Sequence, residues 1–460
     1  MTLRFEQILA EGIAQTSYLV GDDAEGTAAV VDPRPDAEIY LDLARHFGLT
    51  ITHVLETHIH ADFMSGAREL VDRLGGSAEL CVSEEGGAEY DFPHRRLRPG
   101  ERLPFGAVEL EVVATPGHTP EHVSFLLRER DREQPWGILS GDSFFVDSVG
   151  RPDLLGDEQT EELTRALFRT LHEVYRPLPD GTIVYPCHGA GSECGPAIGD
   201  RTSTTIGFER QHNTYFAIDD YEEFRQAMQA DAPPVPTHYP RLKKVNAAGP
   251  AVLGNLPRVP ALGPGAFAAA ARGGRLVDTR DMLAFGGGHI AGAINIGGRP
   301  DLSVWAGWLL DPDQPLFIVL DDDTSLARIV TLLWRVGFTR FGGYLAGGMA
   351  AWQEAGQPLR HLPQLTVHEL CENPGMLPLD VRKEDEWEGG HVPGARHLFL
   401  GELPDRMQEL DRDQPIATYC ASGFRASIAA SLLAASGFDV RNVPGSWKAW
   451  RAAGFDVAKE

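Results

Sequence analysis

Three residues that could bind a metal ion lie close together near the amino-terminal end of the chain. His58, His60 and Asp62 alternate with other residues, and Phe63 follows them directly. The preceding residues 51–56 predict an apolar strand, and the residues after the cluster predict an amphipathic helix. The cluster is therefore expected on a loop at the carboxyl end of a strand, where alternating side chains can converge on one point. Because a phenyl ring offers no lone pair, the pattern favours one metal ion; two loop histidines that cap a helix are the alternative.

Three further predicted strands end in residues of the same kind. They are His118 after the strand 109–115, Asp142 after the strand 136–140, and His188 after the strand 182–185. Any one of these residues alone would be assigned a structural role. Four strand ends that each present a His or Asp, in this order, indicate a shared metal site.

The order of these motifs resembles the metallo-β-lactamase superfamily. The shared segments are His-x-His-x-Asp at 58–62, Gly-His-Thr at 117–119, Gly-Asp at 141–142, and His188. Within the superfamily, the persulfide dioxygenases resemble the chain most, through residues 57–62, 115–120, 150–153 and 185–188. The resemblance spans residues 1 to about 200 and implies an αββα sandwich.

This resemblance implies a mononuclear Fe(II) centre. The iron ligands of the persulfide dioxygenases fall on His58, His118 and Asp142. Two neutral imidazoles and one carboxylate on one face of the metal leave other coordination positions open, as in non-haem Fe(II) oxygenases. Those positions can accept a persulfide sulfur and dioxygen.

Phe63 departs from the pattern of these relatives. The dinuclear hydrolases of the superfamily bind a second metal through Asp62, a histidine at the next position and His188, and most persulfide dioxygenases also carry that histidine. A second metal would lack a ligand in this chain. We therefore assign His60, Asp62 and His188 to the surroundings of the iron, where they would orient ligands and bound water.

Two residues have alternative assignments. Arg151 resembles the family's arginine near the thiol substrate and could hold a carboxylate of glutathione or another carrier; an ion pair with Asp153 or Asp157 is the alternative. Cys194 matches a cysteine near the iron in some fused relatives and could relay sulfur; a loop thiol without a role is the alternative.

The five cysteines are an odd number and show no paired spacing, so a disulfide framework is not expected and at least one should be a reactive thiol. Three of them lie in apolar contexts and are expected to be core residues: Cys81, Cys187 and Cys371.

Composition predicts a cytoplasmic protein of several domains. Its 460 residues suggest about three domains at roughly 150 residues each. Lys and Arg number 41 and Asp and Glu 66, and this net charge of −25 disfavours nucleic acid and anionic membranes as partners. The chain begins without a secretory signal, and no apolar stretch is long enough to cross a membrane. A homo-oligomer is left open.

The first domain is assigned to residues 1–250 and includes a helical linker. Residues 203–230 show helical spacing, which the proline-rich residues 232–240 interrupt. An internal repeat of about 100 residues follows. Its halves share matching segments: 276–280 with 377–382, 287–293 with 389–395, and 347–352 with 445–450.

Each half of the repeat alternates strand and helix, which predicts a parallel sheet flanked by helices. Both halves resemble rhodanese domains, and we assign them to residues 262–360 and 365–460. His289 and His391 belong to a turn that recurs in both halves, so a structural role is favoured for them.

Only the second half carries a chemically competent loop. A strand at 415–419 runs into Cys420, Ala421, Ser422, Gly423, Phe424 and Arg425, and a helix is expected to follow. Backbone N–H groups between a strand and a helix form an anion cradle, which favours the thiolate of Cys420. Arg425 adds a fixed positive charge. The loop is one residue shorter than in the related cysteine phosphatases, which favours sulfur transfer over dephosphorylation; a buried core cysteine is the alternative.

In the first half, Asp321 stands at the cysteine position and Leu326 at the arginine position. Without sulfur no persulfide can form, so this half is interpreted as a degenerate rhodanese domain. The three acidic residues 321–323 predict a solvated loop, with a cation site as the alternative.

The whole chain resembles fused persulfide dioxygenase-rhodanese proteins. The resemblance implies one Fe(II) per chain and a substrate such as glutathione persulfide or another small-thiol persulfide. Dioxygen would oxidise the outer sulfur to sulfite, and Cys420 would make or use thiosulfate. A zinc-dependent thioester hydrolase of the glyoxalase II kind, with appended rhodanese domains, is the alternative enzyme. A sulfur carrier that uses only Cys420 is the alternative without catalysis.

Overall fold

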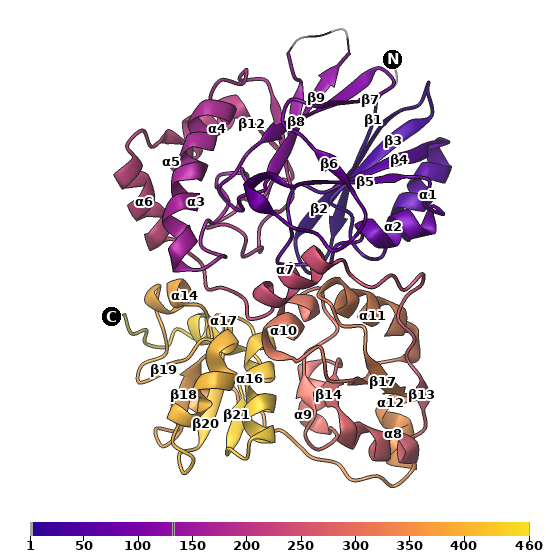
Figure 1. Cartoon of the computed structure of the whole chain (residues 1–460). Coiled ribbons are helices and arrows are strands. Elements are labelled where there is room, and N and C mark those ends of the chain that lie inside the picture. The colour runs from indigo at the N-terminus through magenta and orange to yellow at the C-terminus, as the bar shows by residue number, and fades with distance from the viewer. Residues whose placement is uncertain (1–2, 131, 133, 460) are drawn as a thin grey trace. The chain divides into compact units, whose positions relative to one another are not determined.

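The computed structural model describes residues 3–130, 132 and 134–459, and Figure 1 traces the chain. Two compact units are formed, one by Met1–Leu256 with Trp334–Gly337 and the other by Pro257–Leu333 with Phe338–Glu460. None of the helices in the described residues is both long enough and apolar enough to span a bilayer.

The first unit contains two six-stranded sheets, with the strand orders β1-β2-β3-β4-β5-β6 and β12-β11-β10-β9-β8-β7. The strands of the first sheet are β1 Leu3–Ala10, β2 Gln15–Asp22, β3 Thr27–Val31, β4 Thr50–Leu55, β5 Glu79–Ser83 and β6 Arg95–Leu97. Those of the second are β7 Arg102–Phe105, β8 Val108–Ala114, β9 Val123–Glu129, β10 Gly137–Gly141, β11 Ile183–Pro186 and β12 Thr204–Thr205.

Alternation along the strands explains why the two sheets pack face to face. In β9, Phe125 and Leu127 enter the core between the sheets, whereas Leu126 points to the opposite face and packs with the helices. In β2, Tyr18 enters the same core and Leu19 packs under the helices of the first sheet. Strands that are apolar on both faces require cover on both, and this produces four layers.

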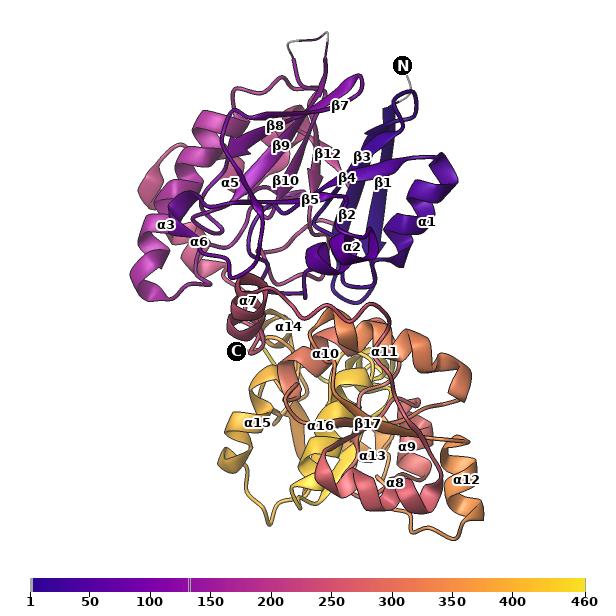
Figure 2. The ribbon, with the colours of Figure 1, turned by 45° about the vertical axis from the view of Figure 1, so that its right-hand side comes forward.

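Helices cover the outer face of each sheet, as Figure 2 shows. On the first sheet lie α1 Glu38–Phe47 and α2 Ala67–Arg73. The second sheet is covered by α3 Asp157–Thr170, its π-helical continuation Leu171–Tyr175, α4 Ile206–His212, α5 Thr214–Ala217 and α6 Tyr221–Ala230. Helix α7 (Tyr239–Ala248) and a 3₁₀ turn at Glu85–Gly87 complete the unit. The predicted αββα sandwich is confirmed.

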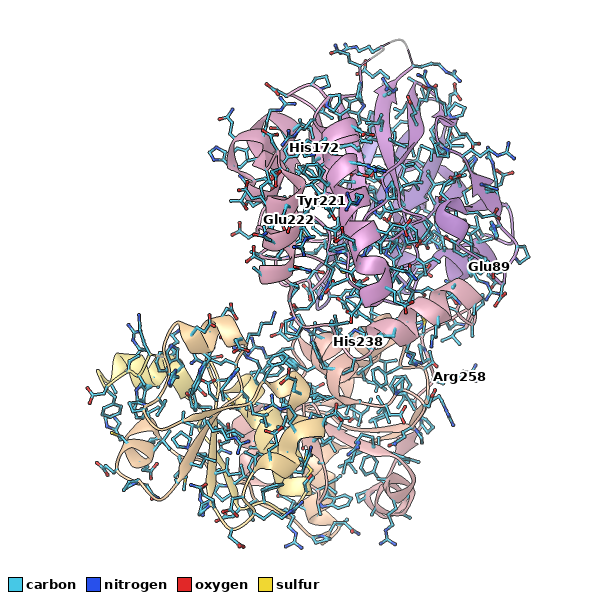
Figure 3. All side chains as sticks on the ribbon, turned by 60° about the vertical axis from the view of Figure 1, so that its left-hand side comes forward. Glu89, His172, Tyr221, Glu222, His238 and Arg258 are labelled. Atoms are coloured by element: carbon cyan, nitrogen blue, oxygen red, sulfur yellow. The ribbon has the colours of Figure 1, made fainter. Side chains whose placement is uncertain are left out.

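Two local predictions differ from the structure. Residues 203–230 form three helices and not one, because Asn213 caps α5 and Asp220 caps α6 with their side-chain oxygens. The proline-rich connector ends earlier than expected, since α7 begins at Tyr239 and takes Pro240 into its first turn, where proline is tolerated. Figure 3 labels Tyr221 and Glu222 of α6 and His238, which precedes α7.

The second unit contains two sheets with the orders β13-β17-β16-β14-β15 and β19-β18-β20-β21, and the neighbouring strands in each are parallel. The strands are β13 Ala261–Leu262, β14 Arg275–Asp278, β15 Ile294–Asn295, β16 Leu316–Val319, β17 Phe341–Leu345, β18 Leu377–Asp380, β19 Arg396–His397, β20 Ile416–Tyr419 and β21 Val440–Asn442.

Helices and turns of the second unit connect these strands. The helices are α8 Pro264–Ala270, α9 Met282–Gly287, α10 Leu302–Leu309, α11 Leu326–Arg335, α12 Gly348–Glu354, α13 Val367–Cys371, α14 Glu384–Glu388, α15 Leu403–Arg406, α16 Phe424–Ala435 and α17 Ser446–Ala452. The last two residues of α11 belong to the first unit. The 3₁₀ turns are Ala271–Gly273, Asp323–Ser325, Leu400–Glu402 and Met407–Glu409.

The internal repeat is visible in the order of the strands and in matching ion pairs. The order β17-β16-β14-β15 of the first half has its counterpart in β21-β20-β18-β19 of the second. Arg280 pairs with Asp278 at 2.6 Å, and Arg382 pairs with Asp380 at 2.5 Å. In both halves the recurring histidine donates from Nδ1 to a backbone carbonyl four residues earlier, at 3.1 Å for His289 and 3.2 Å for His391.

Candidate metal centre and cysteine loop

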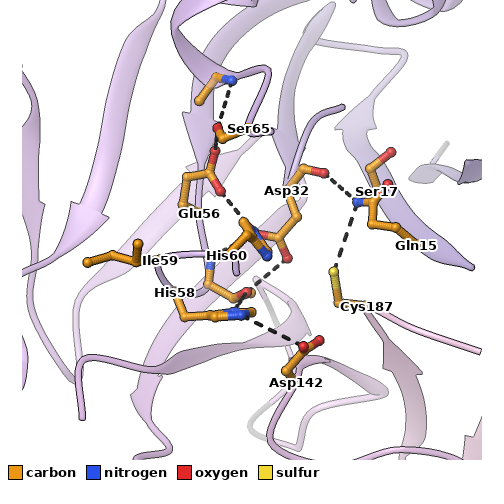
Figure 4. A network of polar contacts seen from close by, with 12 residues as sticks. Gln15, Ser17, Asp32, Glu56, His58, Ile59, His60, Ser65, Asp142 and Cys187 are labelled. Carbon is orange, nitrogen blue, oxygen red and sulfur yellow. Dashed lines mark hydrogen bonds and ion pairs between the residues drawn. The ribbon is translucent and has the colours of Figure 1, made fainter. Parts of the chain in front are cut away.

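Three of the predicted ligands converge on one point in the first unit. His58 follows β4, His118 lies between β8 and β9, and Asp142 follows β10. Nε2 of His58 lies 3.8 Å from Oδ2 of Asp142, and Nε2 of His118 lies 3.5 Å from the same oxygen. All three side chains are buried. Figure 4 shows His58 and Asp142 turned toward one another.

The inner atoms of this group fit a bound metal. Nε2 of His58 and Oδ2 of Asp142 are buried and have no hydrogen-bond partner among the described residues. Buried polar atoms without a partner are costly, and a cation between them would satisfy both. The three ligand atoms lie within 4.8 Å of one another, so one ion can contact all of them.

Hydrogen bonds to the Nδ1 atoms fix the orientation and the tautomer of the two imidazole rings. Thr57 Oγ1 donates to Asp32 at 3.0 Å and therefore accepts from Nδ1 of His58 at 2.9 Å. His118 donates from Nδ1 to the backbone carbonyl of Arg151 at 2.8 Å. Each ring thus carries its proton on Nδ1 and directs the lone pair of Nε2 at the metal position.

Electrostatics keep the three groups in their metal-binding forms. Burial lowers the pKa of His58 well below its usual range, and neighbouring histidines lower it further. Burial also lowers the pKa of His118. Burial alone would raise the pKa of Asp142, but the charge of His188 lowers it. Two neutral imidazoles and one carboxylate therefore face the metal position at neutral pH.

His188 bridges two carboxylates. Nδ1 lies 2.7 Å from Oδ1 of Asp142, and Nε2 lies 2.7 Å from Oδ2 of Asp62. Burial alone would lower the pKa of His188, but the charges of Asp142 and Asp62 raise it to about 10. Because its two nitrogens contact the two carboxylates, His188 holds Asp142 and Asp62 in fixed orientations.

His60 belongs to a second buried cluster behind His58. Its Nε2 lies 2.9 Å from Oε2 of Glu56 and 3.1 Å from Oδ1 of Asp32 (Figure 4). Burial alone would lower the pKa of His60, but these two carboxylates raise it well above its usual range. The ring centroids of Phe63 and His60 lie 4.4 Å apart, and Phe63 is fully buried.

Arg151 is engaged within the protein. Its side chain is 1% exposed, and Nε lies 2.6 Å from Oδ1 of Asp153. A second guanidinium nitrogen donates to Asp153 at 2.7 Å, and the third donates to the backbone carbonyls of Glu193 and Pro234 at 3.2 Å. Of the two assignments, the structure contains the ion pair, and the contact of Arg151 with the metal centre is its backbone carbonyl on His118.

The cysteines of the first unit are buried thiols. Burial raises the pKa of Cys194 and of Cys187 well above the usual range. Sγ of Cys194 lies 3.7 Å from the hydroxyl of Tyr239. Cys81 is buried as predicted, but the prediction for Cys371 is wrong. Cys371 is the last residue of α13 and is exposed, because Val367 and Leu370 form the buried face of that short helix.

The loop of Cys420 joins β20 to α16 in the second unit. Cys420 is buried, its backbone N–H donates to Ser446 Oγ at 3.1 Å, and its Sγ accepts from the backbone N–H of Gly423 at 3.1 Å. Gly423 has a φ of +106°, and a Cβ at this position would lie 2.2 Å from the carbonyl oxygen of Pro444. The tight turn that places an N–H on the sulfur therefore requires glycine.

The other loop residues line the rest of this turn. The carbonyl of Cys420 accepts from the backbone N–H of Trp447 at 2.9 Å, and that of Ala421 accepts from Lys448 at 3.0 Å. Ser422 is exposed, and the ring of Phe424 lies 4.8 Å from the guanidinium carbon of Arg299. These backbone contacts fix the loop against the start of α17.

Arg425 forms a bidentate ion pair with Glu386. Its two terminal nitrogens lie 2.6 and 2.8 Å from the two carboxylate oxygens. Burial alone would lower the pKa of Arg425, but Glu386 and the Cys420 sulfur raise it. The positive charge beside the cysteine is thus held in one orientation.

In the first repeat, the acidic residues 321–323 are exposed, and no metal-ligand group found in the described residues includes them. Asp322 caps the following turn by accepting from the backbone N–H of Thr324 at 2.7 Å. Of the two alternatives for this segment, a solvated loop and a cation site, the exposure of these residues favours the solvated loop.

Comparison with known proteins identifies the family. The model of the metallo-β-lactamase superfamily matches residues 10–188, and the model of the rhodanese-like domain matches residues 264–355 and 364–453. A metallo-β-lactamase of Staphylococcus aureus has a solved structure that is 32% identical, covers 75% of this chain and 98% of its own, and superposes with a TM-score of 0.68. The chain belongs to the metallo-β-lactamase superfamily. It continues into two rhodanese-like domains.

Curated relatives of this metallo-β-lactamase domain come from two reaction classes. The mitochondrial persulfide dioxygenase ETHE1 of Bos taurus is 30% identical over 173 residues, which are 37% of this chain and 63% of the relative. A hydroxyacylglutathione hydrolase of a Polaromonas species is 36% identical over 173 residues, which are 37% of this chain and 61% of the relative. The chain therefore spans slightly less than two thirds of the length of these relatives.

One residue of the metallo-β-lactamase centre was missed from the sequence. His122 accepts from the backbone N–H of Asp142 at 2.9 Å, and its Nδ1 lies 2.8 Å from Thr115 Oγ1. Burial lowers the pKa of His122 to about 3, so the ring stays neutral. It stacks on His58 with 5.0 Å between ring centroids. A second histidine four residues after His118 was the available sequence signal.

Gly141 makes this contact with His122 possible. A Cβ at Gly141 would lie 2.6 Å from Nε2 of His122, and the φ of Gly141 is +54°. Glycine before Asp142 is therefore needed for the close approach of the histidine.

Glu386 was also missed, although the repeat carried a signal for it. In the first half, Ala284 stands at the position of Glu386 and Leu326 at that of Arg425. The repeat that lost the cysteine has thus lost both members of this ion pair, whereas both halves keep the structural Asp-Arg pair of the preceding strand.

Proposed function

We propose that the metallo-β-lactamase domain is a non-haem Fe(II) persulfide dioxygenase and that the last rhodanese-like domain is a sulfurtransferase. The supporting observation is the donor set. His58, His118 and Asp142 converge on one point that could hold an ion, and His188 contacts two carboxylates. With Phe63 at the position of a dinuclear ligand, a second metal would lack one of its ligands. This pattern favours a mononuclear oxygenase centre.

The reaction that fits this centre oxidises the outer sulfur of a small-thiol persulfide. In balanced form, RSSH, O₂ and H₂O give RSH, sulfite and two protons, with four electrons passing from sulfur to dioxygen. Iron would supply open coordination positions for the sulfur and for dioxygen, together with the electrons that activate dioxygen. His58, His118 and Asp142 would hold it, and His188 would keep Asp142 in position.

The chain's own residues account for the remaining requirements. The neutral imidazoles are fixed by Thr57 and by the carbonyl of Arg151, so neither must rotate or lose a proton when the ion binds. Burial of the whole group excludes bulk water, which protects a persulfide from side reactions.

For the second activity, we propose that Cys420 carries sulfane sulfur. A Cys420 persulfide that meets sulfite would give the Cys420 thiolate and thiosulfate, and the reverse reaction would charge the cysteine. The N–H of Gly423 already contacts Sγ and Arg425 lies in a fixed pair beside the loop, so both would stabilise the anionic sulfur. The domain boundaries 1–250, 262–360 and 365–460 stay a prediction.

The second candidate function is a zinc-dependent thioester hydrolase. The hydroxyacylglutathione hydrolases among the relatives favour it. Phe63 counts against its dinuclear version, because a phenyl ring offers no ligand to a second metal.

The two candidates are separated by assaying one preparation after loading with Fe(II) or with Zn(II). The proposal predicts oxygen uptake with glutathione persulfide by the iron form and no hydrolysis of S-lactoylglutathione by the zinc form. Thioester turnover by the zinc form, without oxygen uptake by the iron form, would reverse the assignment.

A further inference from the structure

One face of helix α7 lies against the loop that carries the metal ligands. Tyr239, Lys243 and Asn246 are spaced by four and three residues and therefore share that face. The hydroxyl of Tyr239 lies 3.7 Å from Sγ of Cys194. Asn246 donates from Nδ2 to the backbone carbonyls of His60 and Phe63, both at 2.8 Å. Lys243 lies between these two residues on the face of α7 that contacts the metal-ligand loop.

The ammonium of Lys243 is buried without a partner. Its Nζ is inaccessible to solvent and has no hydrogen-bond partner in the part of the chain that the structure describes. Lys244, the next residue, is exposed. A lysine ammonium that is withdrawn from water without an acceptor is unfavourable unless an anion joins it. A charged side chain without a hydrogen bond leaves donor capacity that a bound anion could use.

The charge of Lys243 also acts on two of the metal ligands. Burial and the neighbouring histidines lower the pKa of His58 most, and the charge of Lys243 lowers it further. It also lowers the pKa of His118. Burial lowers the pKa of Lys243 itself, and Glu121 opposes this. The carboxylate of Glu121 also accepts from the backbone N–H of Ile59 at 3.0 Å, inside the same loop.

An anionic substrate needs such a group here. The chain carries a net charge of −25, and Asp62, Asp142 and Glu121 all lie at the site. A persulfide binds a metal as its anion, and this field would repel it. A buried cation on the helix face that contacts the metal-ligand loop would offset this repulsion and favour an anionic ligand.

We propose that Lys243 binds the anionic terminal sulfur of the persulfide at the metal centre. The substrate part of this inference rests on the proposed persulfide dioxygenase function. Lys243 is a substrate-binding residue in this account, and helix α7, which follows the proline-rich connector, is part of the active site.

The test uses the full-length, iron-loaded protein and four forms: wild type, Lys243→Met, Lys243→Arg and, as a matched control one residue away, Lys244→Met. Binding of azide, a small anion, is measured without oxygen by calorimetry. Oxygen uptake with glutathione persulfide is then measured to separate KM from kcat. Iron content is determined in every sample.

Loss of the charge should weaken azide binding at least about tenfold and raise KM for the persulfide by a similar factor. Lys243→Arg should retain most of the affinity, and Lys244→Met should match the wild type. Iron content should not fall in Lys243→Met, because removal of a nearby cation favours metal binding.

Equal azide affinity and equal KM in Lys243→Met and Lys244→Met would overturn the inference. Loss of iron from Lys243→Met would also overturn it, since this would show a structural role. If wild type takes up no oxygen with the persulfide and azide binding still depends on Lys243, the anion site stands and the proposed substrate and reaction fall.

Discussion

His188 donates from Nδ1 to Oδ1 of Asp142 at 2.7 Å, which leaves Oδ2 as the oxygen that faces His58 and His118. The two oxygens of the Asp142 carboxylate therefore have different roles. One oxygen is held by a cationic imidazole, and the other is free for a metal. In the proposed mononuclear centre, His188 therefore acts through Asp142.

Removing this contact should weaken iron binding without changing the number of metal ions. For His188→Gln, we expect the iron affinity to fall about 10- to 100-fold, because Asp142 loses its orienting partner. Competition with a chelator, followed by metal analysis, measures the change. The exposed His212→Gln serves as the control. Iron retention equal to that control would contradict the role of His188.

Removing the carboxylate ligand itself should separate the two activities. Asp142→Asn is expected to abolish oxygen uptake and to lower the iron content strongly, because the anionic donor is lost. Thiosulfate-dependent sulfur transfer by Cys420 should stay within about twofold of wild type, since both domains carry their own site. An assay of both activities on one sample checks this. Unchanged oxygen uptake would exclude Asp142 as a ligand.

The reciprocal variant tests the cysteine. Cys420→Ser should remove sulfur transfer to sulfite and leave the iron content and the oxygen uptake unchanged, because serine cannot form a persulfide. Cys371→Ser, which changes an exposed thiol in the same unit, is the control. Loss of oxygen uptake in Cys420→Ser would mean that the two sites are obligatorily coupled.

The Glu386–Arg425 pair should hold the cysteine loop in its active form. We expect Glu386→Gln to lower the rate of sulfur transfer about tenfold, because Arg425 loses its bidentate anchor. Glu388→Gln lies on the same short helix, is exposed and should have no effect. Steady-state kinetics with thiosulfate measure the difference. Equal rates in the two variants would show that the pair is dispensable.

The same pair predicts a pH dependence of stability. Burial alone would raise the pKa of Glu386, but Arg425 lowers it below its ordinary value of 4.5. Because the pKa is lower in the folded state, the ionised carboxylate stabilises the folded protein. This stabilisation is complete above the ordinary pKa and is lost as pH falls through the lower pKa of the folded state. The difference in stability between wild type and Glu386→Gln should therefore be constant at neutral pH and shrink below about pH 4. Denaturant unfolding across this range measures it; a difference that persists at low pH would contradict it.

The metal centre was largely predictable because its residues follow apolar strands. His58, His118 and Asp142 each stand where a hydrophobic run ends, and the parallel pairing of β10 with β11 brings two such ends together. Periodicity alone thus locates loops that meet at one edge of a sheet.

Partners from other segments were not predictable in this way. His60 meets Asp32 from the end of β3, and His188 meets Asp62, which lies 126 residues away. Which of several buried acids faces a given histidine depends on how the two sheets pack. Sequence spacing contains no such information.

Helix α7 shows a different limit. The density of prolines correctly indicated an interruption, but Pro240 is compatible with the first helical turn, so the helix could resume immediately. Placing Lys243 and Asn246 beside the metal loop then required the tertiary structure, because α7 reaches residues more than 180 positions earlier in the chain.

The central claim, a single iron that oxidises a persulfide, is tested most directly by measuring metal content and reaction stoichiometry on one sample of the Cys420→Ser protein. This variant cannot convert sulfite to thiosulfate. The account predicts about one iron per chain and one sulfite formed for each dioxygen consumed with glutathione persulfide. Two metal ions per chain, or release of thiol from a thioester without oxygen uptake, would contradict it.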